Sequence, residues 1–512
     1  MTWNYRLIKH SDAGRGVDGE ALQPEEWFAI LRGPAQEQKE GRSVIEAERA
    51  PLIGLHTDRP SVTSTQLRGR FPLPLARICG LALVILPMPA VAVDPQVTVI
   101  KAGVLIDGMG GPPLRNAVIV IEGERITAVG TAIAVPAGAR VLDLSDSTVL
   151  PGFIDAHTHI SAPLVSTPGW EEAHARETAV DTVLRGAFHA QQSLEAGYTT
   201  IREVGARDFT DVSLRNAIRR GWIVGPRMQV AAHAIGITGG HCDESGWVPN
   251  LLGHEPGIAE GIANGPDEIR GAIRYQVKYG ADLIKICATG GVISVGDTAG
   301  AQQYNAEELR TAVETAHMLE RKVAAHAHGT EGIKAAVRAG VDSIEHGSLL
   351  DDEGARLMAE KGTFLVSTLM AGDAVVRMAR DGRLTGAYAA KAMAIGPSMP
   401  KAIARAAAAG VKIVLGTDNI FDPHTTDARE FGLLVGAGLT PMQAIVAGTG
   451  TAAKLLGWEK DVGSIVPGRY ADIVAVKGDP LRDIHALEQV YFVMKGGIVV
   501  KEPEGIGAHP PR

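Results

Sequence analysis

The sequence has few of the residues that build several common protein classes. Only 3 of its 512 residues are cysteines, too few and too scattered for a zinc ribbon or a disulfide framework. Aromatic residues make up 4%, and the net charge is −8 without long blocks of like charge. The chain therefore lacks the basic surface of a nucleic-acid-binding protein, and no nucleic-acid partner is expected. The 45% apolar and 21% charged residues are typical of a globular protein.

The N-terminal region is predicted not to belong to the mature fold. Residues 59–93 contain no acidic residue; three arginines precede a short apolar run that ends before Pro87, and small residues follow up to Ala92. This is the pattern of a secretory signal, and the run is too short for a membrane anchor. We therefore expect residues 1–92 to be a non-mature region with an internal signal at about 62–92 and a start codon assigned too early. Cleavage near Ala92 would give an exported protein, periplasmic or secreted; if the signal is not used, the protein is cytoplasmic.

Short β-rich runs broken by turns occupy both flanks of the remaining chain, over 97–149 and again after Gly463. Neither flank is large enough to form a good core alone. We predict one small β-sandwich domain built from residues 93–149 and 463–512.

Between the flanks, apolar strands alternate with helical stretches, which predicts an α/β fold. Fully apolar strands are expected where both faces of a parallel sheet are covered. The eight candidate strands lie at 149–160, 198–204, 227–233, 281–288, 322–328, 343–346, 363–369 and 412–417. We predict a (β/α)₈ TIM-like barrel over 150–462. An open doubly wound sheet would need a glycine-rich phosphate turn after its first strand, which the sequence lacks.

Charged and imidazole side chains gather at the predicted strand ends, where barrels of this kind hold their active sites. His157 and His159 stand two residues apart and can point to the same side. Lys285 lies inside an apolar strand, where its charge must be paired or removed. Further along, His326, His328, His346 and Asp418 follow three more strands. One such residue is ordinary, but this set predicts a metal centre.

The sequence resembles the amidohydrolase superfamily from about residue 97 to residue 501, and four sequence motifs carry the resemblance. They are Leu-Pro-Gly-Phe-Ile-Asp-Ala-His-Thr-His ending at His159, Ser-Ile-Glu-His-Gly ending at Gly347, Leu-Gly-Thr-Asp ending at Asp418, and Gly-Ser-Ile-Val-Pro-Gly-Arg-Tyr-Ala-Asp-Ile-Val from Gly463. Within the superfamily the chain is similar to the binuclear-metal branch of bacterial Xaa-Pro dipeptidases, metallo-dipeptidases, carboxypeptidases and ochratoxin amidohydrolases.

The resemblance implies two divalent metal ions, with zinc the favoured element and manganese or cobalt not excluded by geometry. It implies that His157, His159 and Asp418 hold one ion and that His326 and His346 hold the other. Lys285 would carry a carbamate from CO₂ that bridges both. Local sequence leaves open whether His326 or His328 is the ligand; the family spacing favours His326 and leaves His328 for the substrate.

The implied reaction is hydrolysis of an amide bond in dipeptides or N-acyl amino acids by a metal-bridging hydroxide, with Asp418 as the catalytic proton carrier. Xaa-Pro dipeptides and ochratoxin-type amides are included in this class. The partner is thus a small molecule or short peptide, and the oligomeric state stays open, a homo-oligomer being one option.

Two other functions were weighed. An imidazolonepropionase-like cyclic amide hydrolase or a deaminase would lack the bridging lysine and place a glutamate where His328 stands. A non-enzymatic binding relative would have lost ligands, whereas all six positions are filled.

Several neighbouring residues have weaker signals. His241, in a Gly-Gly-His-Cys loop, is a candidate contact for the substrate carboxylate. Cys287 is expected to share the inward face of Lys285, which argues against a disulfide. Arg202 and Glu203 are expected to form an internal ion pair.

Overall fold

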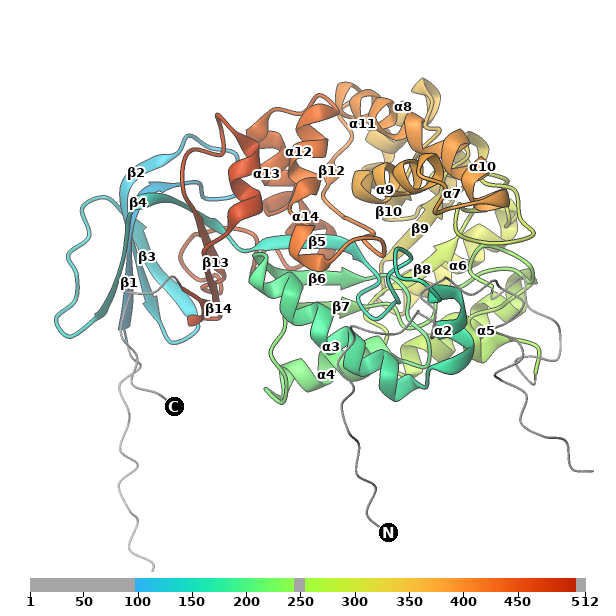
Figure 1. Cartoon of the computed structure of the whole chain (residues 1–512), viewed down its shortest axis with the longest axis horizontal. Helices are drawn as coiled ribbons and strands as arrows, with labels where there is room; N and C mark the ends of the chain where they lie inside the picture. Colours follow the sequence, from blue (N-terminus) through green and yellow to red (C-terminus); the bar gives the residue numbers. More distant parts are fainter. Residues whose placement is uncertain (1–96, 244–253, 503–512) are drawn as a thin grey trace, which may run out of the picture. The chain divides into compact units, whose positions relative to one another are not determined.

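The computed structural model describes residues 97–243 and 254–502, all within one compact unit of the chain (Figure 1). The predicted signal at about 62–92 and its cleavage site near Ala92 lie outside the described residues. Among the described residues, none of the helices has the length and apolar composition needed to cross a membrane.

The two flanks of the chain meet in one sheet of seven strands. The first flank contributes four strands and the second contributes three: β1 (Val97–Leu105), β2 (Leu114–Glu122), β3 (Arg125–Gly130), β4 (Arg140–Pro151), β13 (Ile473–Val476), β14 (Phe492–Lys495) and β15 (Ile498–Lys501). Their order is β15-β14-β13-β4-β1-β2-β3. The flanks thus come together as predicted, but the sandwich of two sheets is not confirmed.

The joining strand is β4, which pairs in parallel with β1 and antiparallel with β13. Apolar side chains from both flanks, such as Ile100, Leu142, Ile473 and Phe492, pack into one buried cluster. Because β4 bonds to strands of both flanks at once, the flanks share a single hydrogen-bonded sheet instead of forming two sheets that face each other.

The middle of the chain supplies eight parallel strands, close to the predicted positions. They are β5 (Phe153–Thr158), β6 (Tyr198–Glu203), β7 (Arg227–Val230), β8 (Ile284–Cys287), β9 (Val323–Ala327), β10 (Ser343–His346), β11 (Phe364–Val366) and β12 (Ile413–Val414). They form a three-stranded sheet in the order β5-β6-β7 and a five-stranded sheet in the order β12-β11-β10-β9-β8.

Backbone hydrogen bonds cross both seams between these two sheets. On one side Asp282 N donates to Val230 O over 2.7 Å, and on the other Ala156 N donates to Leu415 O over 3.0 Å. The arrangement is therefore TIM-barrel-like, although no single closed sheet is formed. Helices cover its outside, as Figure 1 shows.

The helices follow the strands in alternation for most of the chain. Their bounds are α2 (Trp170–Arg176), α3 (Ala179–Glu195), α4 (Thr210–Arg219), α5 (Gly265–Lys278), α6 (Ala306–Met318), α7 (Thr330–Ala339), α8 (Asp352–Lys361), α9 (Leu369–Arg380), α10 (Gly386–Ile395), α11 (Met399–Ala408), α12 (Arg429–Gly436), α13 (Pro441–Ala447) and α14 (Gly450–Leu456). Their apolar sides pack on the strands in one large buried cluster, which includes Ile273 of α5, Ile333 of α7 and Ile403 of α11. This rigid core fixes the strand ends that build the site.

Candidate metal centre

The strand ends surround one cavity of about 750 Å³. All eight residues singled out from the sequence line it: His157, His159, His241, Lys285, His326, His328, His346 and Asp418. They come from β5, β8, β9 and β10, and from the loops that follow β5, β7, β9 and β12. The fold therefore brings together side chains that are up to 261 residues apart in the sequence, from His157 to Asp418.

His157 and His159 present their Nε2 atoms to the same carboxylate. The distances from Asp418 Oδ1 are 3.6 Å to Nε2 of His157 and 3.7 Å to Nε2 of His159. The other ring nitrogen of each is engaged: Nδ1 of His157 donates to Glu345 Oε2 over 2.8 Å, and Nδ1 of His159 donates to Gly205 O over 2.8 Å. This pattern fixes the tautomer that metal-binding histidines need.

Glu345 is a site residue that the sequence analysis missed. It is fully buried on β10 and accepts from Arg202 Nη2 with both oxygens, at 2.8 and 2.9 Å. The predicted pairing of Arg202 with Glu203 is wrong, because neighbouring residues of a strand point to opposite faces. Glu203 instead accepts from Thr158 Oγ1 over 2.6 Å. A carboxylate inside an apolar strand, one residue before His346, is the signal that could have indicated Glu345.

Lys285 and Asp418 are two buried groups of opposite charge that line the cavity. Lys285 is 3% exposed, and burial lowers the pKa of its amine to about 8, against the attraction of Glu345 and Asp418. Burial raises the pKa of the Asp418 carboxyl to about 7, against the attraction of Lys285. A buried amine that loses its proton near neutral pH is chemically reactive as a nucleophile.

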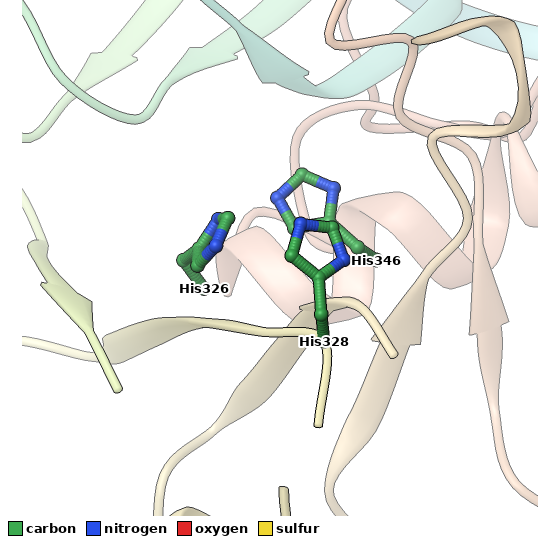
Figure 2. Close-up of side chains that lie close together, drawn as sticks. All are labelled: His326, His328 and His346. Atoms are coloured by element: carbon green, nitrogen blue, oxygen red, sulfur yellow. The ribbon is translucent and has the colours of Figure 1, made fainter. Parts of the chain in front are cut away.

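Figure 2 shows a second group of imidazoles, formed by His326, His328 and His346. Nitrogen atoms of His326, His328 and His346 lie within 4.8 Å of one another, and the same holds for ligand-capable atoms of His157, His346 and Asp418. His346 belongs to both groups, so the two candidate ion positions are adjacent.

The imidazoles of the second group differ in their hydrogen bonds. Nδ1 of His328 is bonded to Ser348 Oγ over 2.7 Å, and Nδ1 of His346 to Thr368 Oγ1 over 2.8 Å. His326 Nε2 is buried and has no hydrogen-bond partner in the described part of the chain. An unsatisfied buried nitrogen costs about 1–3 kcal/mol unless a ligand binds it.

The protonation state of the imidazoles also fits a metal. Burial, together with the neighbouring Lys285 charge, holds the pKa of His157 well below its usual range, and burial with adjacent imidazoles does the same for His326. Both rings are therefore neutral at physiological pH, and neutral imidazole is the form that binds metal ions.

Two of the candidate ligands have strained backbones. His346, the last residue of β10, and Asp418, in the loop after β12, adopt positive φ angles of 69° and 49°. For residues other than glycine this left-handed conformation costs about 1–2 kcal/mol each. Such strain is typical of functional sites, where the fold holds a side chain in a required direction.

The structure contradicts one expectation about cysteine. Cys242 and Cys287 form a disulfide, with Cα atoms 5.9 Å apart. Cys287 does share the cavity side of β8 with Lys285, but the loop that contains Cys242 folds over that same side. The 45-residue separation of the two cysteines has no local signal, so the sequence could not show their contact.

The geometry defines a cavity lined by a candidate metal-ligand cluster, as in metal-dependent enzymes. The model of the Amidohydrolase family matches residues 148–500, so the chain belongs to the amidohydrolase family. It is an enzyme of the hydrolase class.

Two relatives match over most of the chain. Ochratoxinase of Aspergillus niger is 33% identical over 91% of this chain and 96% of its own length. The crystal structure of a Xaa-Pro dipeptidase with bound methionine in the active site is 38% identical, covers 79% of this chain and 100% of its own, and has a TM-score of 0.76. Imidazolonepropionase of Nocardia farcinica matches less well, at 28% identity over 72% of this chain and 88% of its own.

Proposed function

We propose that this enzyme hydrolyses an amide bond in dipeptides or N-acyl amino acids with two divalent metal ions. The observation that supports it most is the paired ligand cluster, in which His157 and His159 aim their Nε2 atoms at Asp418 while Glu345 and Gly205 fix the opposite ring nitrogens. The names of the relatives, an ochratoxinase and a Xaa-Pro dipeptidase, support Xaa-Pro and ochratoxin-type amides as the first substrates to test.

In the proposed ligand set, His157, His159 and Asp418 hold one ion, and His326 and His346 hold the other. Lys285, if carboxylated on its amine, would supply an anionic oxygen ligand to the metal centre. We choose His326 over His328 because the buried Nε2 of His326 otherwise lacks a partner within the described ranges. Neutral imidazoles and carboxylates suit zinc. When bound, the ions supply Lewis acidity, which acidifies water and polarises a carbonyl oxygen.

The remaining steps belong to the side chains of the cavity. The Asp418 carboxylate, with a pKa of about 7, is suited to accept a proton from the attacking water and to pass it to the leaving amine. His328 and His241 line the same cavity and are placed to bind the polar ends of the substrate. Glu345 accepts a hydrogen bond from Nδ1 of His157 and is itself held by Arg202, so the pair fixes the orientation of the His157 ring.

The second candidate is a cyclic amide hydrolase of the imidazolonepropionase type. It is disfavoured by the buried Lys285 that lines the cavity and by the imidazole of His328, where a proton-carrying carboxylate would be expected.

Measurement of metal content together with a dipeptide and N-acyl amino acid screen tests the proposal. We expect close to two divalent ions per chain and turnover of at least one member of the library. His157→Ala should lower the metal content and abolish turnover. His485→Ala is the matched control, because the His485 side chain is 66% exposed and pairs with Glu488. One ion per chain, unchanged in Lys285→Ala, would support the cyclic amide hydrolase instead.

Three further proposals concern the whole chain. We propose that the protein is exported after cleavage near Ala92, that residues 150–462 form the catalytic domain, and that 93–149 and 463–512 form the β domain. The oligomeric state is open.

A further inference from the structure

The Cys242–Cys287 disulfide lies in the wall of the candidate active site. Both cysteines line the cavity, together with His241 and Lys285. Cys287 is the last residue of β8, and Cys242 directly follows His241. The bond therefore joins the strand of the proposed bridging lysine to the loop of a candidate substrate-binding histidine.

This loop is held on β8 at both of its ends. At its start, Ile235 N donates to Lys285 O over 2.8 Å, and Cys287 N donates to Ile235 O over 2.9 Å. At its other end the disulfide returns the chain to Cys287. Gly236 permits this path, because a Cβ there would lie 2.7 Å from the Cβ of Cys242.

The His241 ring is also fixed from the side. Its Nδ1 is bonded to Ser294 Oγ over 2.9 Å, and Ser294 Oγ donates to Asp297 Oδ1 over 2.7 Å. Lys391 Nζ donates to the same carboxylate oxygen over 2.5 Å. A Cβ on Gly291 would collide with the imidazole, so the ring also packs closely on this glycine.

These contacts leave Nε2 as the ring nitrogen available to a ligand. The His241 ring centroid is 4.1 Å from that of His326, a proposed metal ligand. A substrate bound at the metal centre is therefore within reach of His241, provided that the loop holds this position.

We infer that the Cys242–Cys287 disulfide is a positioning element for substrate binding, which acts by holding His241 beside the metal centre. The inference rests on the proposed function. Reduction by a dithiol transfers two electrons and two protons to the bond, gives two thiols and converts the dithiol into its own disulfide. The freed loop would then keep the Ser294 bond to the His241 ring and the bond from His241 N to Gln303 Oε1, but it would lose its covalent link to β8, and substrate affinity should fall.

A double-mutant cycle tests this role. Cys242→Ser should raise KM about tenfold, the effect of losing one well-placed hydrogen bond to a charged substrate group, while kcat changes by less than about threefold. In a His241→Ala background, Cys242→Ser should change KM no further, because the group that it positions is already absent. His485→Ala, in the exposed pair with Glu488, is the control and should leave both constants unchanged.

A loss of kcat or of bound metal with KM unchanged, or additive effects in the two backgrounds, would overturn the inference. If wild type turns over no member of the amide library, the proposed function itself fails. If wild type is active and the cycle is additive, only the role of the disulfide fails.

Counting free thiols in wild type tests the disulfide without relying on a variant that fails to fold. Wild type unfolded without reductant should expose no thiol from Cys242 or Cys287, and reductant should release two. Treatment of folded wild type with reductant should raise KM as the variant does, whereas the Cys242→Ser/Cys287→Ser variant should not respond. Two free thiols before reduction, or an equal response of that double variant, would rule out the positioning role.

Discussion

Lys285 is buried between His157, Asp418 and Glu345, where a permanent ammonium would repel bound cations. Its amine, with a pKa of about 8, has a neutral fraction that can attack CO₂. The new N–C bond forms with loss of one proton and leaves an anionic carbamate. We predict that apo-enzyme regains activity with Zn²⁺ only when bicarbonate is supplied. The measurement is recovery of turnover in CO₂-free buffer, with and without bicarbonate.

Two variants of Lys285 sharpen this test. Lys285→Ala should be nearly inactive, and a short carboxylic acid such as acetate should partly restore it. Lys285→Arg should not be restored, because guanidinium stays charged and cannot be carboxylated. Equal recovery of wild type in both buffers would show that Lys285 is an ordinary lysine.

Asp418→Asn should retain the fold and lose most of kcat. An amide of the same shape cannot accept the proton, and general acid–base catalysis is worth about 10²–10⁴ in rate. Turnover is measured at saturating metal, with metal content checked. Asp422→Asn is the control, since Asp422 pairs with Arg377 and does not line the cavity. More than a tenth of wild-type kcat in Asp418→Asn would mean that another group moves the proton.

At the residue scale, the site residues near the ends of strands could be predicted from the sequence. Side chains two residues apart in a strand point to the same side, so their direction follows from their spacing. All eight predicted residues line the cavity. The sequence analysis missed interactions between distant elements: the hydrogen bond between His157 and Glu345, and the disulfide between Cys242 and Cys287. No local pattern encodes those contacts.

At the scale of elements, all eight barrel strands were predicted, because each is an apolar run between turn residues. The β domain was only half predicted. The alternation of its strands indicated β structure, but the partner of β4 depends on β13 from the opposite flank. A sandwich and a single sheet have the same local pattern, so the sequence could not separate them.

The start of α9 illustrates how one element is held in place by another. Glu430, on α12, accepts hydrogen bonds from the amides of Leu369 and Met370 at 2.9 and 2.7 Å, and it contacts Ser367. Thr368, before the helix, has a positive φ and makes no side-chain cap. Because α9 contributes Ala371, Gly372 and Val375 to the cavity wall, Glu430 supports the site indirectly.

This contact predicts a pH dependence of stability. Burial raises the pKa of Glu430 from its ordinary value of 4.5 to about 8, so the folded protein keeps a proton that the unfolded chain has lost. The contribution of Glu430 to the free energy of unfolding is therefore complete below pH 4.5, and it declines as the pH rises to about 8. Because one pKa unit corresponds to about 1.4 kcal/mol, Glu430→Gln should remove on the order of 4 kcal/mol of that decline.

Urea unfolding at pH 5 and pH 8.5 measures this difference. The control is Glu314→Gln, because the Glu314 side chain is 71% exposed on α6. Identical pH dependence in wild type and Glu430→Gln would show that Glu430 does not hold the proton.

At the scale of the whole molecule, the disulfide bears on where the enzyme works. Disulfides persist in oxidising compartments and are rare in the cytosol. We predict that the active protein, expressed in a bacterium with Sec export, is periplasmic, begins near Val93 and contains the oxidised Cys242–Cys287 pair. N-terminal sequencing of the periplasmic protein measures the start. Met1 on the active periplasmic form would exclude both the signal and the late start.

The sheet shared by the two flanks sets the order in which the chain can fold during synthesis. β1, β2 and β3 can pair early, because they are neighbours in sequence. The strand β4, which pairs with β1, meets β13 only after the ribosome has made the whole barrel segment. The nascent chain therefore leaves one edge of β4 unpaired until β13 emerges, so a chain that lacks the C-terminal flank exposes a strand edge to which another chain can pair.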